Sequence, residues 1–229
     1  MAPSRARAQD AVREGKVLVS GLPATKPDRM VAPSEPIELA RPGPRYVGRG
    51  GEKLEAALRE LSIDVAGKRC LDLGASTGGF TDCLLQHGAS SVIAVDVGHG
   101  QLDWSLRRDA RVKVLERTDV RELDPATVGE VDLVTVDVSF ISLRTVLPSI
   151  AALAGRAAVL ALVKPQFEVG RRNVPPGGVV RDPDLQARAV AGVVHAAEKL
   201  GLRCRAAVPS PIEGAQGNRE FFVWLEAET

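Results

Sequence analysis

Acids and a lysine recur in this sequence directly after short apolar runs. Asp96 ends the run SVIAVD, Asp137 follows VDLVTV, and Lys164 follows AAVLALV. Each run has the length of one buried strand, and the carboxyl ends of parallel strands meet at one edge of a sheet, where open α/β folds bind their ligands. Carboxylates and an amine at such an edge can bind hydroxyl groups and move protons. The pattern therefore predicts a ligand site with acid–base groups there.

The stretch RCLDLGASTGGF, residues 69–80, predicts where a ligand would lie. It reads as a strand, a glycine-rich turn and the start of a helix. Glycines let backbone N–H groups approach a ligand, and a helix N-terminus favours negative charge. Ser76 occupies the second glycine position of a dinucleotide fingerprint, and loops of the form D-x-G-x-x-x-G are typical of S-adenosylmethionine sites. The expected cofactor contacts in this stretch are Asp72, Gly74, Ser76, Thr77, Gly78, Gly79 and Phe80.

Two further acids are expected to contact the same ligand. Asp96 lies 24 residues after Asp72, at the position where doubly wound folds hold a ribose hydroxyl pair. Asp119 lies just beyond the next expected strand, Val112–Leu115.

The elements that would carry these residues alternate between strand and helix. Apolar residues recur at helical spacing over 51–61, a capped helix is expected over 182–200, and the last two strands are expected at 203–208 and 221–225. This alternation predicts an α/β protein with a Rossmann-like, doubly wound sheet. Lys53 stands in the first turn of the 51–61 helix, where the helix dipole disfavours a cation, so a partner or a function is expected to hold it there.

Length and composition restrict the class of protein. The 229 residues suit one α/β domain of roughly 150 to 200 residues with a small appendage. Three cysteines without a C-x-x-C pair favour a reducing, cytoplasmic compartment. His87, His99 and His195 lack metal-ligand spacing, so no metal is expected. The longest apolar run, Ala157–Val163, is too short to span a bilayer, and no membrane segment is expected.

The N-terminal segment is basic and rich in proline. Residues 1–53 hold ten Lys or Arg against six Asp or Glu, a net charge of +4, whereas residues 54–229 have a net charge of −3. The pattern predicts a short helix over 4–14, a strand over 16–19 and a second strand near 37–39. The charge asymmetry suggests a segment that faces a polyanion, although a solvated basic surface explains it equally well.

Motifs spread along the chain carry a resemblance to a known family. They are GASTGGFTD, DVSFISL, LVKPQFE, GGVVRD and SPIEGAQGNREF. They resemble the TlyA (haemolysin A-like) family of ribosomal RNA 2′-O-methyltransferases, in which an S4-like RNA-binding module precedes an FtsJ-like methyltransferase domain. The resemblance implies a class I S-adenosylmethionine-dependent methyltransferase fold with a small N-terminal α+β appendage. It also implies S-adenosyl-L-methionine as cofactor, ribosomal RNA or ribosomal subunits as partners, and cytidine 2′-hydroxyls as the methylated groups.

The same resemblance implies domain boundaries and site residues. The domains are a partial S4-like module at 1–40, a linker at 41–47 and an FtsJ-like domain at 48–229. Gly48 stands where the family more commonly has serine, and the opening helix of the S4-like module is not in the sequence. The family's K-D-K-E tetrad falls on Lys53, Asp137, Lys164 and Glu220, and its cofactor motifs include Asp72, Gly74, Gly78 and Asp96. RNA contacts are expected at Ser4, Arg5, Arg7, Gln9, Arg13, Lys16 and Arg49.

The tetrad suits methyl transfer to a ribose hydroxyl. That reaction needs an in-line approach and loss of the hydroxyl proton, with no obligatory metal. A lysine accepts a proton only as the neutral amine, and a second cation nearby together with partial burial favours that form. Lys164 is therefore the expected base and Lys53 the second cation, which orients the hydroxyl. Asp137 and Glu220 are expected to position the two amines.

Two other classes of function stay open at this point. The loop also reads as G-x-S-x-G around Ser76, with Asp137 and His195 following in the order of serine hydrolases. No HGGG-type oxyanion motif precedes it, however, and His195 lies in an apolar helical stripe. A membrane-active haemolysin is suggested by the family's older name, but lysine-rich amphipathic helices with Trp or Phe are missing. The pattern specifies no single nucleotide and no oligomeric state.

Overall fold

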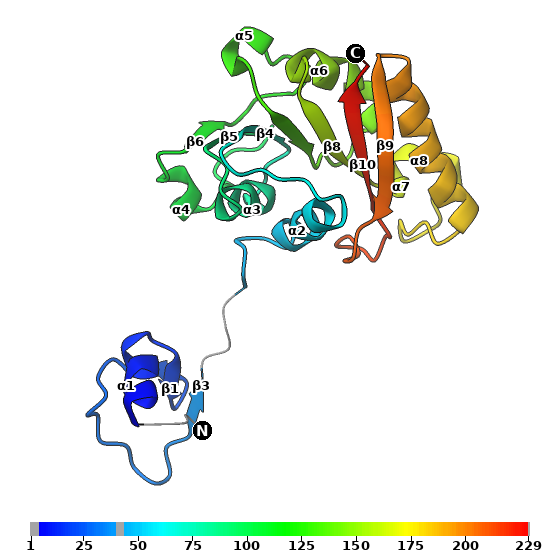
Figure 1. Ribbon diagram of the computed structural model, residues 1–229. Coiled ribbons are helices and arrows are strands. Elements are labelled where there is room, and N and C mark those ends of the chain that lie inside the picture. Colours follow the sequence, from blue (N-terminus) through cyan, green and yellow to red (C-terminus); the bar gives the residue numbers. More distant parts are fainter. Residues whose placement is uncertain (1–4, 40–43, 229) are drawn as a thin grey trace. The chain divides into compact units, whose positions relative to one another are not determined.

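The computed structural model describes residues 5–39 and 44–228. It divides the chain into two compact units, Met1–Arg45 and Tyr46–Thr229, each with its own sheet (Figure 1). The boundary implied by the resemblance places residues 41–47 in a linker. Tyr46 is nevertheless buried in the second unit, where its ring lies against Gly51.

The N-terminal unit combines one helix with a three-stranded antiparallel sheet of order β2-β1-β3. Ser20 and Gly21, between β1 and β2, both have left-handed φ values of 52° and 79°, as in a two-residue type I′ hairpin turn. The predicted helix and strands are confirmed for the described residues, and Ser4, the predicted start of the helix, lies outside them. The elements are α1 (Arg5–Arg13), β1 (Val17–Val19), β2 (Leu22–Pro23) and β3 (Ile37–Leu39).

The second unit is built on a seven-stranded sheet of order β6-β5-β4-β7-β8-β10-β9. Strands β4 to β8 run parallel, and β10 lies antiparallel between β8 and β9. The predicted α/β fold is confirmed, and each predicted strand of this unit lies within two residues of its expected bounds. The strands are β4 (Arg69–Leu73), β5 (Ser91–Val95), β6 (Val112–Leu115), β7 (Leu133–Val136), β8 (Ala158–Val163), β9 (Leu202–Pro209) and β10 (Phe221–Ala227).

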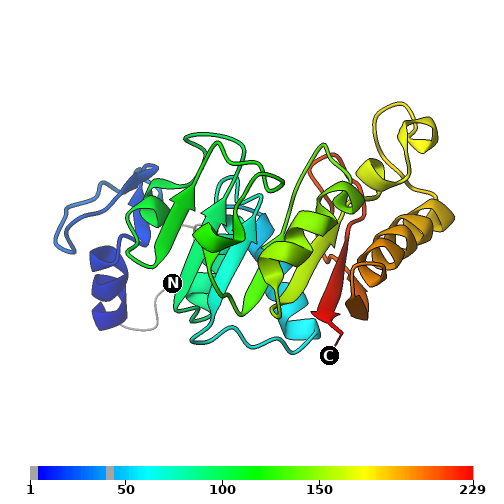
Figure 2. The same cartoon turned by 90° about the horizontal axis from the view of Figure 1, so that it is seen from above.

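Helices cover both faces of this sheet (Figure 2). Successive strand residues point to opposite faces, so Leu71 packs in the core beneath α6 and α8 while Cys70 packs in the core beneath α2 and α3. The helical elements are α2 (Gly50–Glu60), α3 (Gly79–Gln86), α4 (Trp104–Arg107), α5 (Pro125–Val128), α6 (Leu143–Ala154), α7 (Pro165–Glu168), the 3₁₀ turn η1 (Arg171–Asn173) and α8 (Pro183–Glu198).

One edge of the sheet collects the ends of strands from distant parts of the sequence. The carboxyl ends of β4, β5, β7 and β8 meet there because these strands are parallel neighbours. The start of β10 reaches the same edge because β10 runs in the opposite direction, with Phe221 opposite Val163. This edge positions the site described next.

Candidate active site

A pocket of about 350 Å³ opens at this edge of the sheet. All four residues of the expected tetrad line it: Lys53, Asp137, Lys164 and Glu220. The wall also includes Arg49 at the start of α2, the glycine loop, Gln166 of α7 and Gln216 from the loop before β10. The structure therefore brings together residues from five separate segments of the chain.

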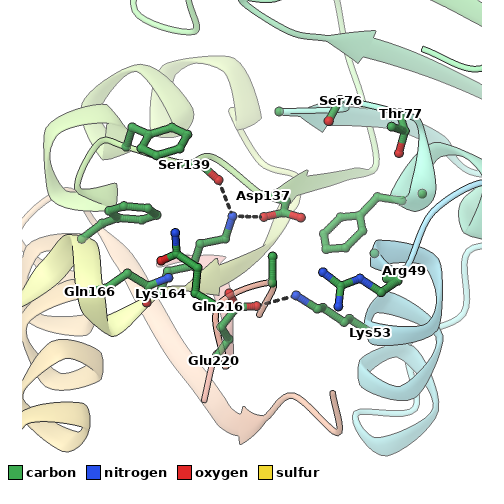
Figure 3. Close-up of a pocket in the computed structure, with 17 residues that line it drawn as sticks. Arg49, Lys53, Ser76, Thr77, Asp137, Ser139, Lys164, Gln166, Gln216 and Glu220 are labelled. Carbon is green, nitrogen blue, oxygen red and sulfur yellow. Dashed lines mark hydrogen bonds and ion pairs between the residues drawn. The ribbon is translucent and has the colours of Figure 1, made fainter. Parts of the chain in front are cut away.

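The tetrad forms two lysine–carboxylate pairs (Figure 3). Lys164 Nζ lies 2.5 Å from Asp137 Oδ1, and Lys53 Nζ lies 2.6 Å from Glu220 Oε2. The side chains of Lys53 and Glu220 are 9% and 3% exposed, and those of Lys164 and Asp137 are 11% and 23% exposed. A buried charge without a partner is costly, so the pairing is what allows two amines to sit in one pocket.

Strand direction brings three of the four residues into the pocket. Asp137 directly follows β7 and Lys164 directly follows β8, which are parallel neighbours. Glu220 directly precedes β10, whose first residue, Phe221, is opposite Val163 at the end of β8. Two strand ends and one strand start therefore converge on the same point.

Close glycine packing brings Lys53 to the same edge. A Cβ at Gly79, the first residue of α3, would lie 2.9 Å from the backbone nitrogen of Gly51 and 3.2 Å from Cα of Gly50. Only glycine lets the N-terminal ends of α2 and α3 approach so closely. Lys53 is buried in the first turns of α2, and Glu220 is the partner that offsets its unfavourable position in the helix dipole.

A second pocket, of about 310 Å³, shares five lining residues with the first, among them Gly74 and Ser76, and is also lined by Asp96 and Asp119. The Asp96 carboxylate accepts hydrogen bonds from the backbone N–H groups of Ser76, at 2.8 Å, and Gly98, at 2.7 Å. Each carboxylate oxygen can accept a further hydrogen bond, as from a ribose hydroxyl. Asp96 thus shapes the glycine loop and keeps capacity for a ligand.

The glycine loop is fitted closely to the neighbouring strand end. Gly74 has a φ of +84°, and a Cβ there would lie 2.5 Å from the carbonyl oxygen of Asp137. Thr77 and Phe80 line the first pocket, whereas Gly78 is buried at the N-cap of α3 with a φ of +99°. The loop backbone, rather than its side chains, is therefore what lies closest to the strand end carrying Asp137.

Asp72 lies beneath the glycine loop and not on a pocket wall. Its side chain is fully buried and accepts hydrogen bonds from Thr81 Oγ1 at 2.7 Å and Thr135 Oγ1 at 2.9 Å. Burial raises the pKa of the Asp72 carboxyl to about 6, against the opposing effect of these hydrogen bonds. Asp72 ties β4 to α3 and β7, so any effect of this residue on a ligand passes through the loop above it.

Asp119 is strongly acidic. Its hydrogen bonds with the Arg121 side chain, helped by the Arg121 backbone N–H, lower the pKa of the Asp119 carboxyl to about 2. Asp119 is therefore ionised at neutral pH where it lines the second pocket.

Several residues that line these pockets were not predicted from the sequence. Ser139 accepts a hydrogen bond from Lys164 Nζ at 2.7 Å. Phe140 is 90% exposed and its ring centroid lies 5.4 Å from that of Phe167. The side-chain oxygen of Gln166 is buried, and within the described part of the chain no group donates a hydrogen bond to it. Each of these residues follows a charged strand-end residue by two or three positions, and that proximity was the available signal.

The expected RNA contacts lie in both units. Arg49 lines the first pocket. Arg13 and Lys16 form exposed ion pairs with neighbouring acids of the same segment, at 3.1 Å and 2.6 Å, which are surface pairs of low stability. Ser4 lies outside the described residues. The remaining expected contacts are exposed or half-buried on α1: Arg5, Arg7 and Gln9.

The structure does not assemble the alternative serine hydrolase. His195 is exposed on α8 and lines neither of the pockets that contain Ser76 and Asp137. Among the described residues, no group of three or more His, Cys, Asp or Glu is placed to hold a metal ion. None of the described helices combines the length and the apolar character that a membrane crossing requires.

The models of two known families match this chain. The model of the FtsJ-like methyltransferase family matches residues 46–227, and the S4 domain model matches residues 1–37. The first match spans most of the chain and contains the whole tetrad. The chain belongs to the FtsJ-like methyltransferase family. Its two family matches are those that the sequence motifs implied, so the predicted family is confirmed.

Relatives of this FtsJ-like chain extend over its whole length. It is 51% identical to the 16S/23S rRNA (cytidine-2′-O)-methyltransferase TlyA of Mycobacterium tuberculosis, over 100% of the chain and 87% of that protein. It is 40% identical to Hemolysin A of Brachyspira hyodysenteriae, over 95% of the chain and 92% of that protein. A solved structure from Streptococcus thermophilus that bears a hemolysin name matches with a TM-score of 0.78 at 39% identity, covering 99% of this chain and 84% of the other.

Proposed function

We propose that this protein methylates ribose 2′-hydroxyl groups of cytidines in ribosomal RNA of the small or large subunit, with S-adenosyl-L-methionine as methyl donor. The observation that carries the proposal is the gathering of two lysine–carboxylate pairs in one pocket beside the glycine loop. The relative from Mycobacterium tuberculosis, at 51% identity, is named for the same reaction.

The second pocket has the donor and acceptor set that S-adenosylmethionine needs. Asp96 would hold the ribose hydroxyls, and the backbone of the glycine loop would lie along the methionine portion. The 2.5 Å separation between a Cβ at Gly74 and the Asp137 carbonyl leaves no room for a side chain where the loop passes the strand end. Asp119, ionised and on the same wall, is an acceptor for further polar groups of the ligand.

When bound, S-adenosylmethionine supplies the methyl group, whose bond to sulfur breaks as its bond to the ribose oxygen forms, with the electron pair remaining on sulfur. The two pockets share Gly74, Ser76 and Asp137, so a donor in one and a nucleotide in the other would meet at these residues. Holding both reactants in line would raise the rate by proximity and orientation.

The tetrad would remove the hydroxyl proton. Lys164, as the neutral amine, accepts the proton from the 2′-hydroxyl, and Asp137 holds the amine in place at 2.5 Å. Lys53, paired with Glu220 at 2.6 Å, would donate a hydrogen bond to the same ribose oxygen. The expected roles of the four residues are therefore compatible with their pairing.

The N-terminal unit would supply affinity for RNA. Its match to the S4 domain and its exposed Arg5, Arg7 and Arg13 favour contacts with phosphates, which position a protein on RNA without reading its sequence. Arg49, which lines the first pocket, would contact a phosphate near the methylated nucleotide. Because the proposed substrate is ribosomal RNA, we place the activity in the cytoplasm.

Incubation of the purified chain with methyl-labelled S-adenosylmethionine and separated ribosomal subunits tests the proposal. We expect label in 2′-O-methylcytidine after nuclease digestion, in at least one subunit, and labelling slower by about 100- to 10,000-fold when the Lys164→Ala variant replaces the wild type. Naked ribosomal RNA run in parallel reports whether the assembled subunit is required. Label in a base or in protein, or no label in any fraction, would contradict the proposed reaction.

A further inference from the structure

We infer that Ser139 is a positioning residue, whose hydroxyl acts with the Asp137 carboxylate to fix the direction in which Lys164 accepts the ribose proton. The inference rests on the proposed function and deepens it. Ser139 lies outside the tetrad, on the loop that follows β7, and it lines both pockets.

The contacts around the Lys164 amine carry the inference. Lys164 Nζ donates a hydrogen bond to Ser139 Oγ at 2.7 Å and lies 2.5 Å from Asp137 Oδ1 (Figure 3). An aliphatic amine nitrogen is tetrahedral, so one direction holds its bond to carbon and three others remain. The hydrogen bond to Ser139 occupies one of these three, and the Asp137 carboxylate, an ion-pair partner 2.5 Å away, closes a second to other groups. Only one direction is left for a third partner.

The charge of Lys164 decides whether an N–H group or the lone pair of the nitrogen points in that third direction. In the ammonium form it holds an N–H group, since an ammonium has three donors. In the neutral form one N–H group is donated to Ser139, and the negative charge of Asp137 repels a lone pair on its own side of the nitrogen, so the lone pair occupies the remaining direction. The 2′-hydroxyl proton then moves to this lone pair: the O–H bond breaks, an N–H bond forms, and the electron pair stays on oxygen. Lys164 is left as an ammonium and returns the proton to water.

The other lysine of the tetrad lacks this arrangement. Among the described residues, Lys53 has one acceptor for its amine, Glu220, at 2.6 Å. Two directions of its nitrogen are therefore left open, which suits a cation that donates hydrogen bonds. A serine hydroxyl in addition to the carboxylate beside Lys164, against a carboxylate alone beside Lys53, distinguishes a directed base from a charge partner.

The loop that carries Ser139 is held in an uncommon conformation. Phe140, the next residue, has a φ of +65°, and a non-glycine residue keeps this conformation only where its surroundings enforce it. The Phe140 ring packs against Phe167 of α7, three residues after Lys164. The segments that carry the serine and the lysine thus contact each other beyond the hydrogen bond itself.

Replacement of Ser139 by alanine and by threonine tests the inference in single-turnover methyl transfer to ribosomal subunits. We expect Ser139→Ala to lower the rate constant at saturation by roughly 10- to 100-fold, the loss of one hydrogen bond to a charged or charging group. The KM values for S-adenosylmethionine and for the subunit should stay within about threefold of the wild-type values. Ser139→Thr keeps the hydroxyl and should recover most of the rate.

A double variant separates action through Lys164 from direct action on the substrate. In a Lys164→Ala background, Ser139→Ala should cause no further loss, because the amine that the serine orients is already gone. Losses that multiply, a loss confined to KM, or a Ser139→Ala rate within about threefold of wild type would each overturn the inference. A wild-type rate for Ser139→Ala in an enzyme that Lys164→Ala inactivates overturns the role of Ser139 alone. A wild-type chain that transfers no methyl group overturns the proposed function and this inference together.

Discussion

Replacement of Lys164 by arginine separates a base from an electrostatic clamp. Arginine keeps the positive charge and roughly the length of lysine, but it cannot be deprotonated in a protein. Its guanidinium has enough donors to hold both present partners of the amine, Asp137 and Ser139. The variant therefore preserves the ion pair and removes only the capacity to accept a proton.

The expected loss of rate in the Lys164→Arg variant is large. A general base contributes about 100- to 10,000-fold to a rate, which corresponds to about 3 to 5 kcal/mol of transition-state free energy. Lys164→Arg should therefore be about as slow as Lys164→Ala. In the alanine variant, Asp137 also loses its partner, but its side chain is 23% exposed, so water can solvate the carboxylate.

Single-turnover methyl transfer to ribosomal subunits measures both variants, with thermal unfolding and S-adenosylmethionine calorimetry as checks on folding and cofactor binding. Lys53→Arg is the matched control, because the proposed role of Lys53 requires charge and not proton acceptance. It should keep more of the wild-type rate than Lys164→Arg does. A Lys164→Arg rate within a few-fold of wild type would refute the base role and leave Lys164 as a charge that stabilises the reacting groups.

The other predictions concern the cofactor, the RNA and the buried acid. Asp96→Ala should weaken S-adenosylmethionine binding by about 1.5–3 kcal/mol in calorimetry, with Asp96→Asn intermediate, and tight NAD binding by the wild type would contradict the assignment. Deletion of residues 1–40 should weaken RNA binding and flatten its salt dependence while leaving cofactor affinity unchanged; equal salt slopes would argue against phosphate contacts in this segment. Because burial raises the pKa of Asp72 from 3.8 to about 6, the folded state retains a proton that the unfolded state releases. The wild type should thus lose about 2 kcal/mol of stability relative to Asp72→Asn between pH 4 and pH 6, measured by denaturant unfolding, and parallel curves would exclude the shift.

Local patterns are sufficient to predict most of the sheet and part of the site. Buried parallel strands are near-continuous apolar runs, so β5, β7 and β8 can be recognised directly, and the residue after each run has to lie at the carboxyl edge. That rule is enough to predict that Asp96, Asp137 and Lys164 share one edge of the sheet. It holds because parallel neighbours share a direction, whatever their side chains are.

Helix α6 shows where local patterns fail. It contains Pro148, which removes a backbone donor from the helix interior, and the apolar pattern of this segment did not lead us to expect a helix. Burial of Val146, Leu147 and Ile150 in the core compensates for that loss. Its N-terminus is also held from outside, because Glu168 accepts a hydrogen bond from the backbone N–H at 143, at 2.7 Å. Neither compensation is visible in a window of the sequence.

Glu220 illustrates a different limit. It was assigned through the family resemblance, because nothing near it in sequence marks it as a site residue. It pairs with Lys53, which is 167 positions away, and the pairing depends on β10 running antiparallel beside β8. The sequence has no helix between the last two strands, which favours an antiparallel pair, but nothing local indicates that β10 inserts between β8 and β9.

The two lysine pairs of the pocket are therefore held by different means. Asp137 and Lys164 sit at the ends of adjacent parallel strands, and their separation is set by the hydrogen-bonded register of β7 and β8. Lys53 reaches the pocket on a helix, through the close approach of Gly79 to the start of α2. A proton acceptor must be aimed to within a fraction of an ångström, whereas a charge acts over several ångströms with little dependence on angle. The more rigid support thus carries Lys164, the residue whose proposed role has the stricter geometric requirement.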